Sequence, residues 1–193
     1  SGYLCAPMTE ERADQLGLPL MWPTSQDPLR TRYTVAVDAA CGITTGIDAA
    51  QRARTARVLA DATSTPTDLV RPGHVLPLRA RTGGVLERRG HTEAAVDLAR
   101  LAGLEPVGLI GELVGDDGMC LRADAIADLA RAEGLAFITI DQLAQWRRVH
   151  DTVLAAPPRR VMALASAQLP THYGHFTIAG YRDNLTGAEH VLL

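Results

Sequence analysis

The stretch RPGHVLPLRARTGGVLERRGHTEAAVDLARLAGL at residues 71–104 leads from an apolar strand through a basic, glycine-containing turn into an amphipathic helix. The pattern predicts that this helix opens at His91 and Thr92 and ends at Gly103, because glycine is typical of the position after a helix. A helix N-terminus carries unpaired N–H groups and about half a positive charge, so it can bind an anion. The turn before this helix is therefore a candidate phosphate site.

Each residue at the start of this helix can contribute to binding or catalysis. Arg88 and Arg89 can pair with phosphate oxygens, and Gly90 lets the backbone approach a ligand closely. His91 can donate or accept a proton or bind a metal, and Thr92 offers a hydroxyl as the helix cap. A solvated basic loop that caps a helix is the alternative interpretation. The combination of residue types at one helix start favours the phosphate site.

His74 and Glu112 are the candidate acid–base residues. His74 follows the turn at residues 71–73 and leads into an apolar strand expected at residues 75–78, so a structural histidine is the alternative. Glu112 lies in the apolar run PVGLIGELV at residues 106–114, which is expected to be a buried strand. A buried, unpaired carboxylate is costly, so Glu112 should pair with a cation or metal or have a raised pKa. The alternative is a glutamate at the strand end that reaches solvent.

The rest of the chain alternates helical and strand-like patterns, which predicts an α/β fold of the α+β three-layer type, a mixed sheet flanked by helices. Residues 21–31 and 64–73 are expected to be loops. Helices, with Thr9, Asp48 and Asp141 as caps, are expected at residues 9–16, 48–60, 92–102, 124–133 and 141–147. Strands are expected at residues 32–39, 75–78, 106–114 and 135–140.

Three weaker candidates have no assigned role. Asp38 closes the strand expected at residues 32–39 and is ambiguous. The hydroxyls and N–H groups of GITTG, residues 42–46, could line a sugar or phosphate pocket, but a plain turn is favoured. Asp116 and Asp117 are more typical of a turn than of metal ligands.

Composition limits the classes of protein to which the chain can belong. With 193 residues, 47% hydrophobic and 21% charged, it is typical of a folded soluble protein with one domain, or one domain and part of another. A net charge of -3 gives no electrostatic reason to propose nucleic acid or a membrane as the partner. Cys5, Cys41 and Cys120 form no CxxC motif, which argues against a disulfide framework or a cysteine zinc site and favours a reduced, cytoplasmic setting. We find no apolar run of membrane-spanning length and no signal-peptide pattern.

The pattern along the chain predicts more than one domain. Residues 1–150 are expected to form the first domain, residues 151–161 a proline-containing linker, and residues 162–193 the first strands of a second domain. Both ends are apolar and strand-like, which indicates a fragment, with a processed terminus as the alternative at the start. Sheet edges left unpaired at such ends predict poor solubility in isolation.

Several long motifs resemble one enzyme family. TTGIDAAQRARTARVLAD, DLVRPGHVLPLRARTGGVLERRGHTEAAVDLARLAGL, and GELVGDDG followed by ITIDQL resemble 3,4-dihydroxy-2-butanone-4-phosphate synthase of riboflavin biosynthesis. The resemblance covers about residues 1–148. It implies a lyase that converts D-ribulose 5-phosphate to 3,4-dihydroxy-2-butanone 4-phosphate and formate with Mg²⁺ or Mn²⁺. It also implies a homodimer with active sites near the subunit interface.

The resemblance implies roles for particular residues. His74 and Glu112 would be essential to the chemistry, with Glu112 touching the substrate, and His91 would ligate the metal. The substrate would be bound by the helix start, that is by Arg88, Arg89, Gly90, His91 and Thr92. Gly111 stands where the family commonly has a cysteine, a change that we expect to be tolerated. The family's acidic loop, an arginine-glutamate-asparagine-glutamate-glycine-aspartate run that supplies a metal-binding glutamate, does not occur in this sequence and is expected before residue 1.

The C-terminal part resembles a second family. RRVMALASAQ followed by LPTHYGHFTIAGYRDNLTGAEHVLL is similar to the opening of GTP cyclohydrolase II, whose zinc cysteines lie further along, and this implies a bifunctional parent protein. One alternative is a non-catalytic phosphate-binding or dimer-forming domain. Another is a protein whose main activity is the cyclohydrolase, with a vestigial synthase half. The presence of His74, His91 and Glu112 argues against the vestigial half.

Overall fold

In the computed structural model, the chain forms two compact units, Ser1–Ala144 and Gln145–Leu193. The linker expected at residues 151–161 falls largely on residues 152–160, which lie outside the described residues. The structure describes residues 3–24, 26–151, 161–183 and 187–192.

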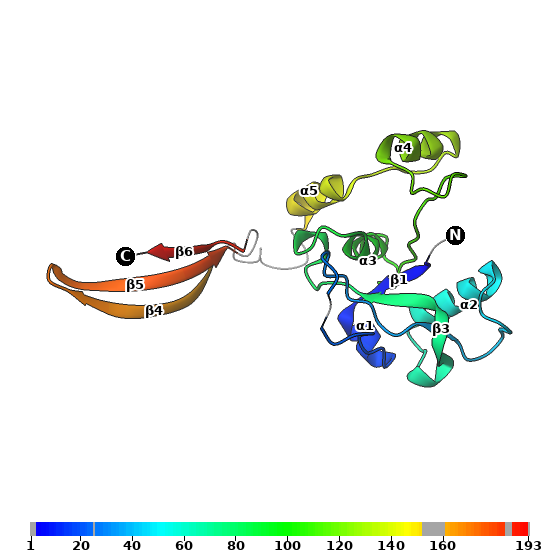
Figure 1. Cartoon of the computed structure of the whole chain (residues 1–193), viewed down its shortest axis with the longest axis horizontal. Helices are drawn as coiled ribbons and strands as arrows, with labels where there is room; N and C mark the ends of the chain where they lie inside the picture. Colours follow the sequence, from blue (N-terminus) through cyan, green and yellow to red (C-terminus); the bar gives the residue numbers. More distant parts are fainter. Residues whose placement is uncertain (1–2, 25, 152–160, 184–186, 193) are drawn as a thin grey trace. The chain divides into compact units, whose positions relative to one another are not determined.

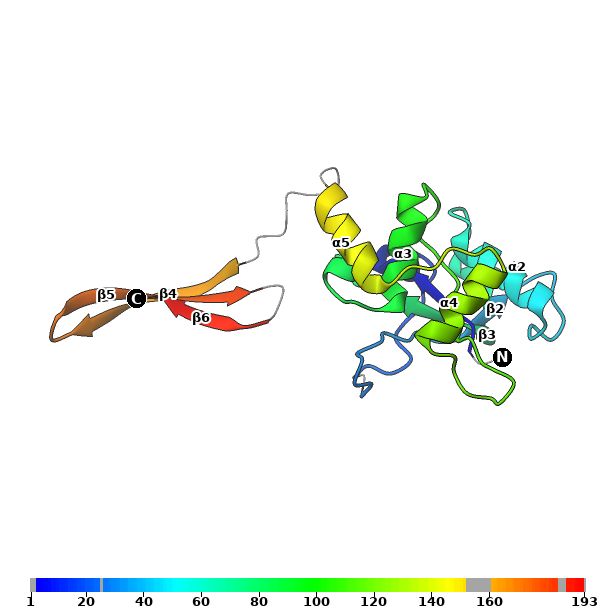
Figure 2. The same ribbon diagram turned by 90° about the horizontal axis from the view of Figure 1, so that it is seen from above.

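The first unit is built on a small mixed sheet with the strand order β1-β3-β2 (Figure 1 and Figure 2). The central strand β3 (Leu69–Arg79) pairs in parallel with β1 (Cys5–Met8) and antiparallel with β2 (Val37–Ala39). The predicted α+β class, a mixed sheet with helices against it, is confirmed.

Helices pack against this sheet from several directions (Figure 2). α1 (Glu10–Gln15) contacts β3, α2 (Ala49–Ala60) contacts β2 and β3, and α3 (His91–Leu101) contacts β1. Two short 3₁₀ turns, η1 (Pro66–Asp68) and η2 (Gly84–Leu86), flank β3 in the chain. The Thr55 hydroxyl of α2 accepts the backbone N–H of Ala39 at 3.0 Å, which ties the helix to β2. The helices therefore hold the short strands in register.

Local capping signals place the first two helices as predicted. The Thr9 hydroxyl accepts the backbone N–H of Arg12 at 3.1 Å, and Asp48 Oδ1 accepts that of Gln51 at 2.9 Å. These bonds satisfy N–H groups that a helix start leaves without intrahelical partners.

The last helix, α5 (Ile140–His150), begins one residue before its expected cap. The Thr139 hydroxyl accepts the backbone N–H of Gln142 at 3.1 Å, and Gln142 Oε1 accepts that of Thr139 at 2.8 Å. This reciprocal arrangement is a capping box, so Thr139 and not Asp141 caps the helix.

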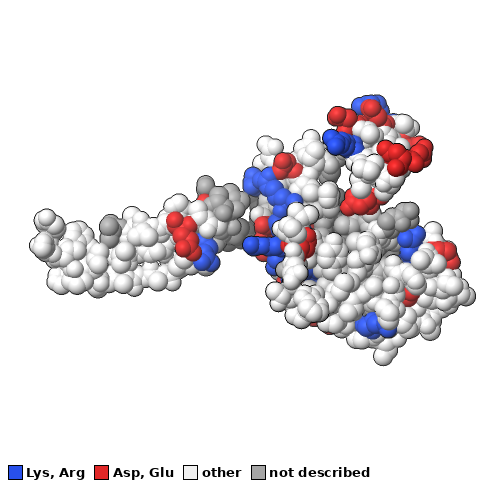
Figure 3. All heavy atoms as spheres, in the orientation of Figure 1, with Lys and Arg blue, Asp and Glu red and all other residues white. Residues whose placement is uncertain are grey.

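Several charged side chains lie on the surface of α4 (Ala123–Ala132), among uncharged ones (Figure 3). Asp128 and Arg131 form an exposed ion pair at 2.7 Å, while Ala130 is the buried residue of this helix. α4 is thus a largely solvated element of the first unit.

The core consists of two apolar clusters. Fully burying a large apolar side chain stabilises the fold by about 1.5–3 kcal/mol, so these clusters carry much of the stability. The first joins the sheet to α1 and α2 and contains Ala6, Met8, Ala13, Leu16, Leu18, Val37, Leu59, Leu69 and Val75. The second joins α3, α5 and η2 and contains Val85, Ala94, Leu143 and Ala144.

Two predicted strands were wrong. Among the described residues, 106–114 make only isolated bridges: Val107 with Met8 and Ile110 with Cys5 of β1, and Val114 with Cys120. Residues 135–139 are exposed and form no strand. A strand needs a hydrogen-bonded neighbour as well as an apolar composition, and among the described residues no further strand lies beside these segments.

One expected strand and one expected loop have other boundaries in the structure than the sequence predicted. The strand expected at residues 32–39 is regular only over Val37–Ala39, preceded by isolated bridges at Tyr33 and Thr34. The loop expected at residues 64–73 contains η1 and the first half of β3, so β3 begins earlier than the apolar run at residues 75–78 suggested.

The second unit carries an antiparallel sheet with the order β4-β5-β6. It contains β4 (Val161–Thr171), β5 (Gly174–Asp183) and β6 (Glu189–Leu192), in line with the strand-rich pattern of this region. β4 and β5 form a hairpin in which Thr171 pairs with Gly174. Within the described part of the chain, we find no helix with the length and apolar character needed to span a membrane.

Candidate functional site

His74 and Asp38 form a hydrogen-bonded pair across two neighbouring strands. Asp38 Oδ2 lies 2.7 Å from His74 Nδ1, and Asp38 Oδ1 accepts the backbone N–H of His74 at 2.9 Å. The Asp38 side chain is 6% exposed and that of His74 is 40% exposed. A carboxylate on Nδ1 holds a proton there and leaves Nε2 able to accept one. The arrangement can therefore serve as a general base whose orientation is fixed.

Sequence reasoning missed this pairing because Asp38 had no assigned role. A signal was present, since Asp38 follows the apolar residues VAV and a buried carboxylate needs a partner. The identity of the partner depends on the register between β2 and β3, which no local pattern specifies.

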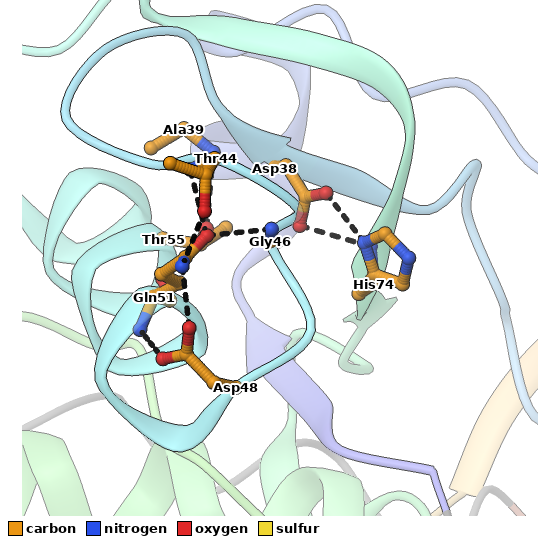
Figure 4. A network of polar contacts seen from close by, with 8 residues as sticks. All are labelled: Asp38, Ala39, Thr44, Gly46, Asp48, Gln51, Thr55 and His74. Atoms are coloured by element: carbon orange, nitrogen blue, oxygen red, sulfur yellow. Dashed lines mark hydrogen bonds and ion pairs between the residues drawn. The ribbon is translucent and has the colours of Figure 1, made fainter.

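The loop at residues 42–46 closes over the His74–Asp38 pair (Figure 4). Gly46 has φ +81°, and a Cβ atom at this position would overlap Asp38 Oδ2 and lie 2.9 Å from His74 Nδ1. Both the backbone conformation and the lack of space require glycine here. What the sequence favoured as a plain turn is in fact packed on the candidate base.

Gln51 holds this loop in place. Its Oε1 accepts the backbone N–H groups of Thr44 at 2.8 Å and Gly46 at 2.6 Å. Its Nε2 donates to the Thr44 hydroxyl at 2.9 Å and to Asp48, the cap of α2 (Figure 4). One side chain therefore links the start of α2 to the residues that cover His74.

His74 opens onto a cavity of about 630 Å³ in the first unit. Arg52 of α2 lines the same cavity. The remaining wall is mostly apolar and includes Leu4, Ala36, Ile47 and Leu76. A small polar molecule placed here would meet two basic side chains in otherwise apolar surroundings.

The basic turn before α3 is held together by an internal ion pair. Arg88 Nη1 donates to Glu93 Oε2 at 2.5 Å, while Nε and Nη2 donate to the carbonyl of Leu29 at 3.1 and 2.9 Å. Arg88 Nη2 also donates to the Thr31 hydroxyl at 3.1 Å. Glu93 is 1% exposed and accepts the backbone N–H of Arg81 at 3.1 Å. Most donors of Arg88 therefore have partners within the chain.

Gly90 lies against this ion pair and directly precedes α3. A Cβ atom at Gly90 would overlap Arg88 Nη1 and lie 2.7 Å from Glu93 Oε2, so the glycine makes room for the pair. Gly90 is also the N-cap residue and provides no side-chain cap. The expectation that Thr92 supplies a hydroxyl cap was wrong, because Thr92 lies inside the helix and is buried. The first N–H groups of α3 are thus not capped by a side chain.

Arg89 and His91 are the accessible members of this turn. Arg89 forms an ion pair with Asp141, and their side chains are 47% and 77% exposed. Exposed pairs of this kind contribute only about 0–1 kcal/mol, so Arg89 can exchange Asp141 for an anionic ligand at low cost. His91 is exposed at the first position of α3.

Glu112 is exposed, so its expected burial in a strand was wrong. Ile110 and Cys5 exchange two backbone hydrogen bonds of 2.9 Å, and a Cβ atom at Gly111 would lie 3.7 Å from the carbonyl oxygen of Tyr3. Burial, and then the nearby charge of Glu112, raise the pKa of the Cys5 thiol. Glu112 therefore lies near the start of β1, beside Tyr3, which lines the His74 cavity.

The predicted site residues do not all surround one cavity. The structure brings Arg88, Arg89, Gly90, His91 and Thr92 together at one helix start, whereas the His74 cavity includes none of them and not Glu112. Among the residues that the structure describes, no three His, Cys, Asp or Glu side chains are arranged to hold a metal ion.

Comparisons with known proteins point to one family. A family model described as 3,4-dihydroxy-2-butanone 4-phosphate synthase matches residues 1–146. The riboflavin biosynthesis proteins RibBA of Salinispora tropica and Nocardia farcinica are each 51% identical to this chain; the matches cover 100% of it but only 46% and 45% of those proteins. The chain therefore spans a little under half the length of these relatives.

Solved structures with similar folds are synthases of the same description. A 3,4-dihydroxy-2-butanone 4-phosphate synthase in complex with two magnesium ions is 44% identical with a TM-score of 0.75, over 80% of this chain and 77% of that one. RibBX of A. baumannii, a two-domain synthase, is 39% identical with a TM-score of 0.75, over 98% of this chain and 54% of that one.

Proposed function

Because this chain belongs to the 3,4-dihydroxy-2-butanone 4-phosphate synthase family, we propose that its protein converts D-ribulose 5-phosphate to 3,4-dihydroxy-2-butanone 4-phosphate and formate in riboflavin biosynthesis. The observation that carries this proposal is the His74–Asp38 pair, with His74 opening onto a cavity. The reaction begins with enediol formation, which needs a base for a proton on carbon next to a carbonyl. His74 Nε2 is that base, and Asp38 stabilises the imidazolium that forms.

The substrate phosphate binds at the start of α3. The uncapped N–H groups and the helix dipole favour an anion there, and Arg89 can give up its exposed partner to the phosphate. Arg88 and Gly90 shape this turn, and Thr92 and His91 lie at its edge. Glu112 contacts the sugar portion of the substrate.

The enzyme uses Mg²⁺ or Mn²⁺, as the magnesium complex of a related synthase suggests. Such an ion polarises neighbouring oxygens of a substrate when bound. His91 is the ligand that this chain supplies. The described residues do not by themselves form a complete site for the ion.

The active enzyme is a homodimer whose sites draw on both chains. This explains why His74 and the residues at the start of α3 line no common cavity among the described residues of one chain. The protein acts in the cytoplasm on a small sugar phosphate, with neither nucleic acid nor a membrane as its partner. It forms part of a bifunctional protein with GTP cyclohydrolase II, a proposal that the greater length of the RibBA relatives supports.

Formate release from ribulose 5-phosphate by the full-length protein tests the activity. His74→Ala and Glu112→Gln should each abolish release, while Glu133→Gln, at an exposed glutamate on the end of α4, serves as the matched control. Retained activity in either variant removes the role assigned to that residue. Turnover of GTP, measured separately, decides whether the cyclohydrolase is the main activity.

Mixed dimers test the composite site. Co-expressed His74→Ala and Glu112→Gln chains should recover part of the formate release, because one site of a mixed dimer can contain both intact residues. No recovery in isolated mixed dimers would place both residues of a site in the same chain.

A further inference from the structure

Arg52 of α2 is a half-buried arginine. Its Nε atom is closed off from solvent and has no hydrogen-bond acceptor, and no ion pair of Arg52 occurs among the described residues. The next arginine of α2 contrasts with it, since Arg54 Nε donates to the carbonyl of Cys41 at 2.6 Å. Arg57, on the same helix, is exposed to water.

A guanidinium N–H group that is closed off from water and has no acceptor is costly. A guanidinium is always charged and carries five N–H donors, and a buried donor without an acceptor costs about 1–3 kcal/mol, more when it is charged. Two carboxylates of β2 and α2 are already engaged, Asp38 with His74 and Asp48 with the start of α2. Arg52 Nε therefore has no acceptor among the described residues.

The position of Arg52 indicates where an acceptor could enter. Arg52 lines the same cavity of about 630 Å³ as His74. The wall of this cavity is largely apolar, so it offers few groups that compete with Arg52 for a negative oxygen. A ligand with an anionic oxygen would meet the cation and the imidazole together.

We propose that Arg52 binds an anionic oxygen of a small, oxygen-rich ligand that occupies the His74 cavity. The identity of this ligand rests on the proposed function: it is the reacting sugar, whose phosphate lies at the start of α3. When His74 Nε2 takes the proton from carbon, the C–H electron pair forms a carbon–carbon double bond. The carbonyl π pair moves to oxygen, and Arg52 stabilises the resulting enediolate.

Three variants of the full-length protein test this role. Arg52→Met should lower kcat for formate release by about 10²-fold, the effect typical of removing one donor to a developing oxyanion, with little change in KM. Arg52→Lys, which keeps the charge, should recover part of kcat. Arg57→Met is the matched control on an exposed face of α2 and should behave as the unaltered protein. If Arg52→Met does not fold, kcat of Arg52→Lys is compared with kcat of Arg57→Met. A lower value for Arg52→Lys supports the role of Arg52, and equal values overturn it.

Binding can be read without turnover. Titration with inorganic phosphate should shift the His74 imidazole NMR signals in the unaltered protein and in Arg57→Met, but not in Arg52→Met. A full-length protein that releases no formate yet shows this shift would refute the proposed function and leave the anion site standing.

Two outcomes distinguish the existence of the anion site at Arg52 from the identity of the oxygen that it binds. A raised KM with unchanged kcat in Arg52→Met would support the anion site but overturn the enediolate as its ligand, in favour of the phosphate. Unchanged kcat and KM with an undiminished phosphate-induced shift would overturn the proposal altogether.

Discussion

His74 Nδ1 lies 2.7 Å from Asp38 Oδ2, although the two residues are 36 positions apart in the chain. Asp38→Asn keeps the shape of the side chain but presents an amide where the carboxylate stood, so the Nδ1 proton is no longer fixed and the imidazolium loses its counter-charge. We expect kcat for formate release by the full-length protein to fall by about 10²-fold, within the range that general acid–base catalysis contributes. Asp128→Asn, in an exposed ion pair on α4, is the control. Equal rates for the two variants would contradict a role for the pair.

Gly46 should tolerate no side chain. In Gly46→Ala the new methyl group overlaps Asp38 Oδ2 and the residue must hold φ +81°, so the loop has to move off the His74–Asp38 pair. Activity should fall without loss of the fold, because the loop is exposed over much of its length. Gly118→Ala is a matched control, since Gly118 has φ +80° but nothing within 4 Å of the added Cβ. The comparison of kcat and circular dichroism separates crowding at the site from backbone strain.

Glu93 should matter for stability. Glu93→Ala leaves Arg88 without its buried counter-ion and the Arg81 N–H without its acceptor. Removing one partner of a buried ion pair typically costs about 3–5 kcal/mol, and partial exposure of Arg88 places the expected loss near the lower end, about 3 kcal/mol. Urea unfolding measures the change. Asp128→Ala, in the exposed pair on α4, should shift the free energy of unfolding by no more than about 0.5 kcal/mol.

Asp27 should contribute to the acid sensitivity of the segment that contacts Arg88. The backbone N–H of Thr31, then its hydroxyl, and the backbone N–H of Leu29 hold the pKa of Asp27 below its ordinary value. Because the pKa of Asp27 is lower in the folded than in the unfolded state, its charge stabilises the fold at pH values above the unfolded-state pKa of about 3.9. This contribution is lost as the pH falls through the folded-state pKa.

Asp27→Asn should therefore weaken the dependence of the unfolding midpoint on pH below about pH 4, and only slightly, because Asp27 lies at the surface. Unfolding curves of both proteins between about pH 2 and pH 6 measure this difference. Identical curves would show that the turn does not depend on the charge of Asp27.

Local signals in the sequence predicted what depends on a few neighbouring residues. Thr9 and Asp48 cap their helices as expected, and Gly103 ends α3 with φ +69°. The basic turn at the start of α3 and its motifs pointed to the family for the same reason: these residues are adjacent in the chain.

The wrong predictions share a cause. Residues 106–114 and 135–140 have the composition of buried strands, but strand formation depends on a neighbour that can lie far away in the chain. Among the described residues the first segment makes only isolated bridges, with β1 and between Val114 and Cys120. Thr92 is not the cap because the helix already begins at His91. The cap position belongs to Gly90, where a side chain would collide with the Arg88–Glu93 pair.

The sequence by itself determined the family, the starts of α1 and α2 and the apolar strand that follows His74, because each is encoded within a short segment. Only the tertiary structure decided that Asp38 orients His74, that Gly46 covers the pair and that Arg52 shares its cavity. These contacts follow from the register of β2 on β3 and from the packing of α2 on both strands. Register and packing are properties of distant segments acting together, so no local pattern contains them.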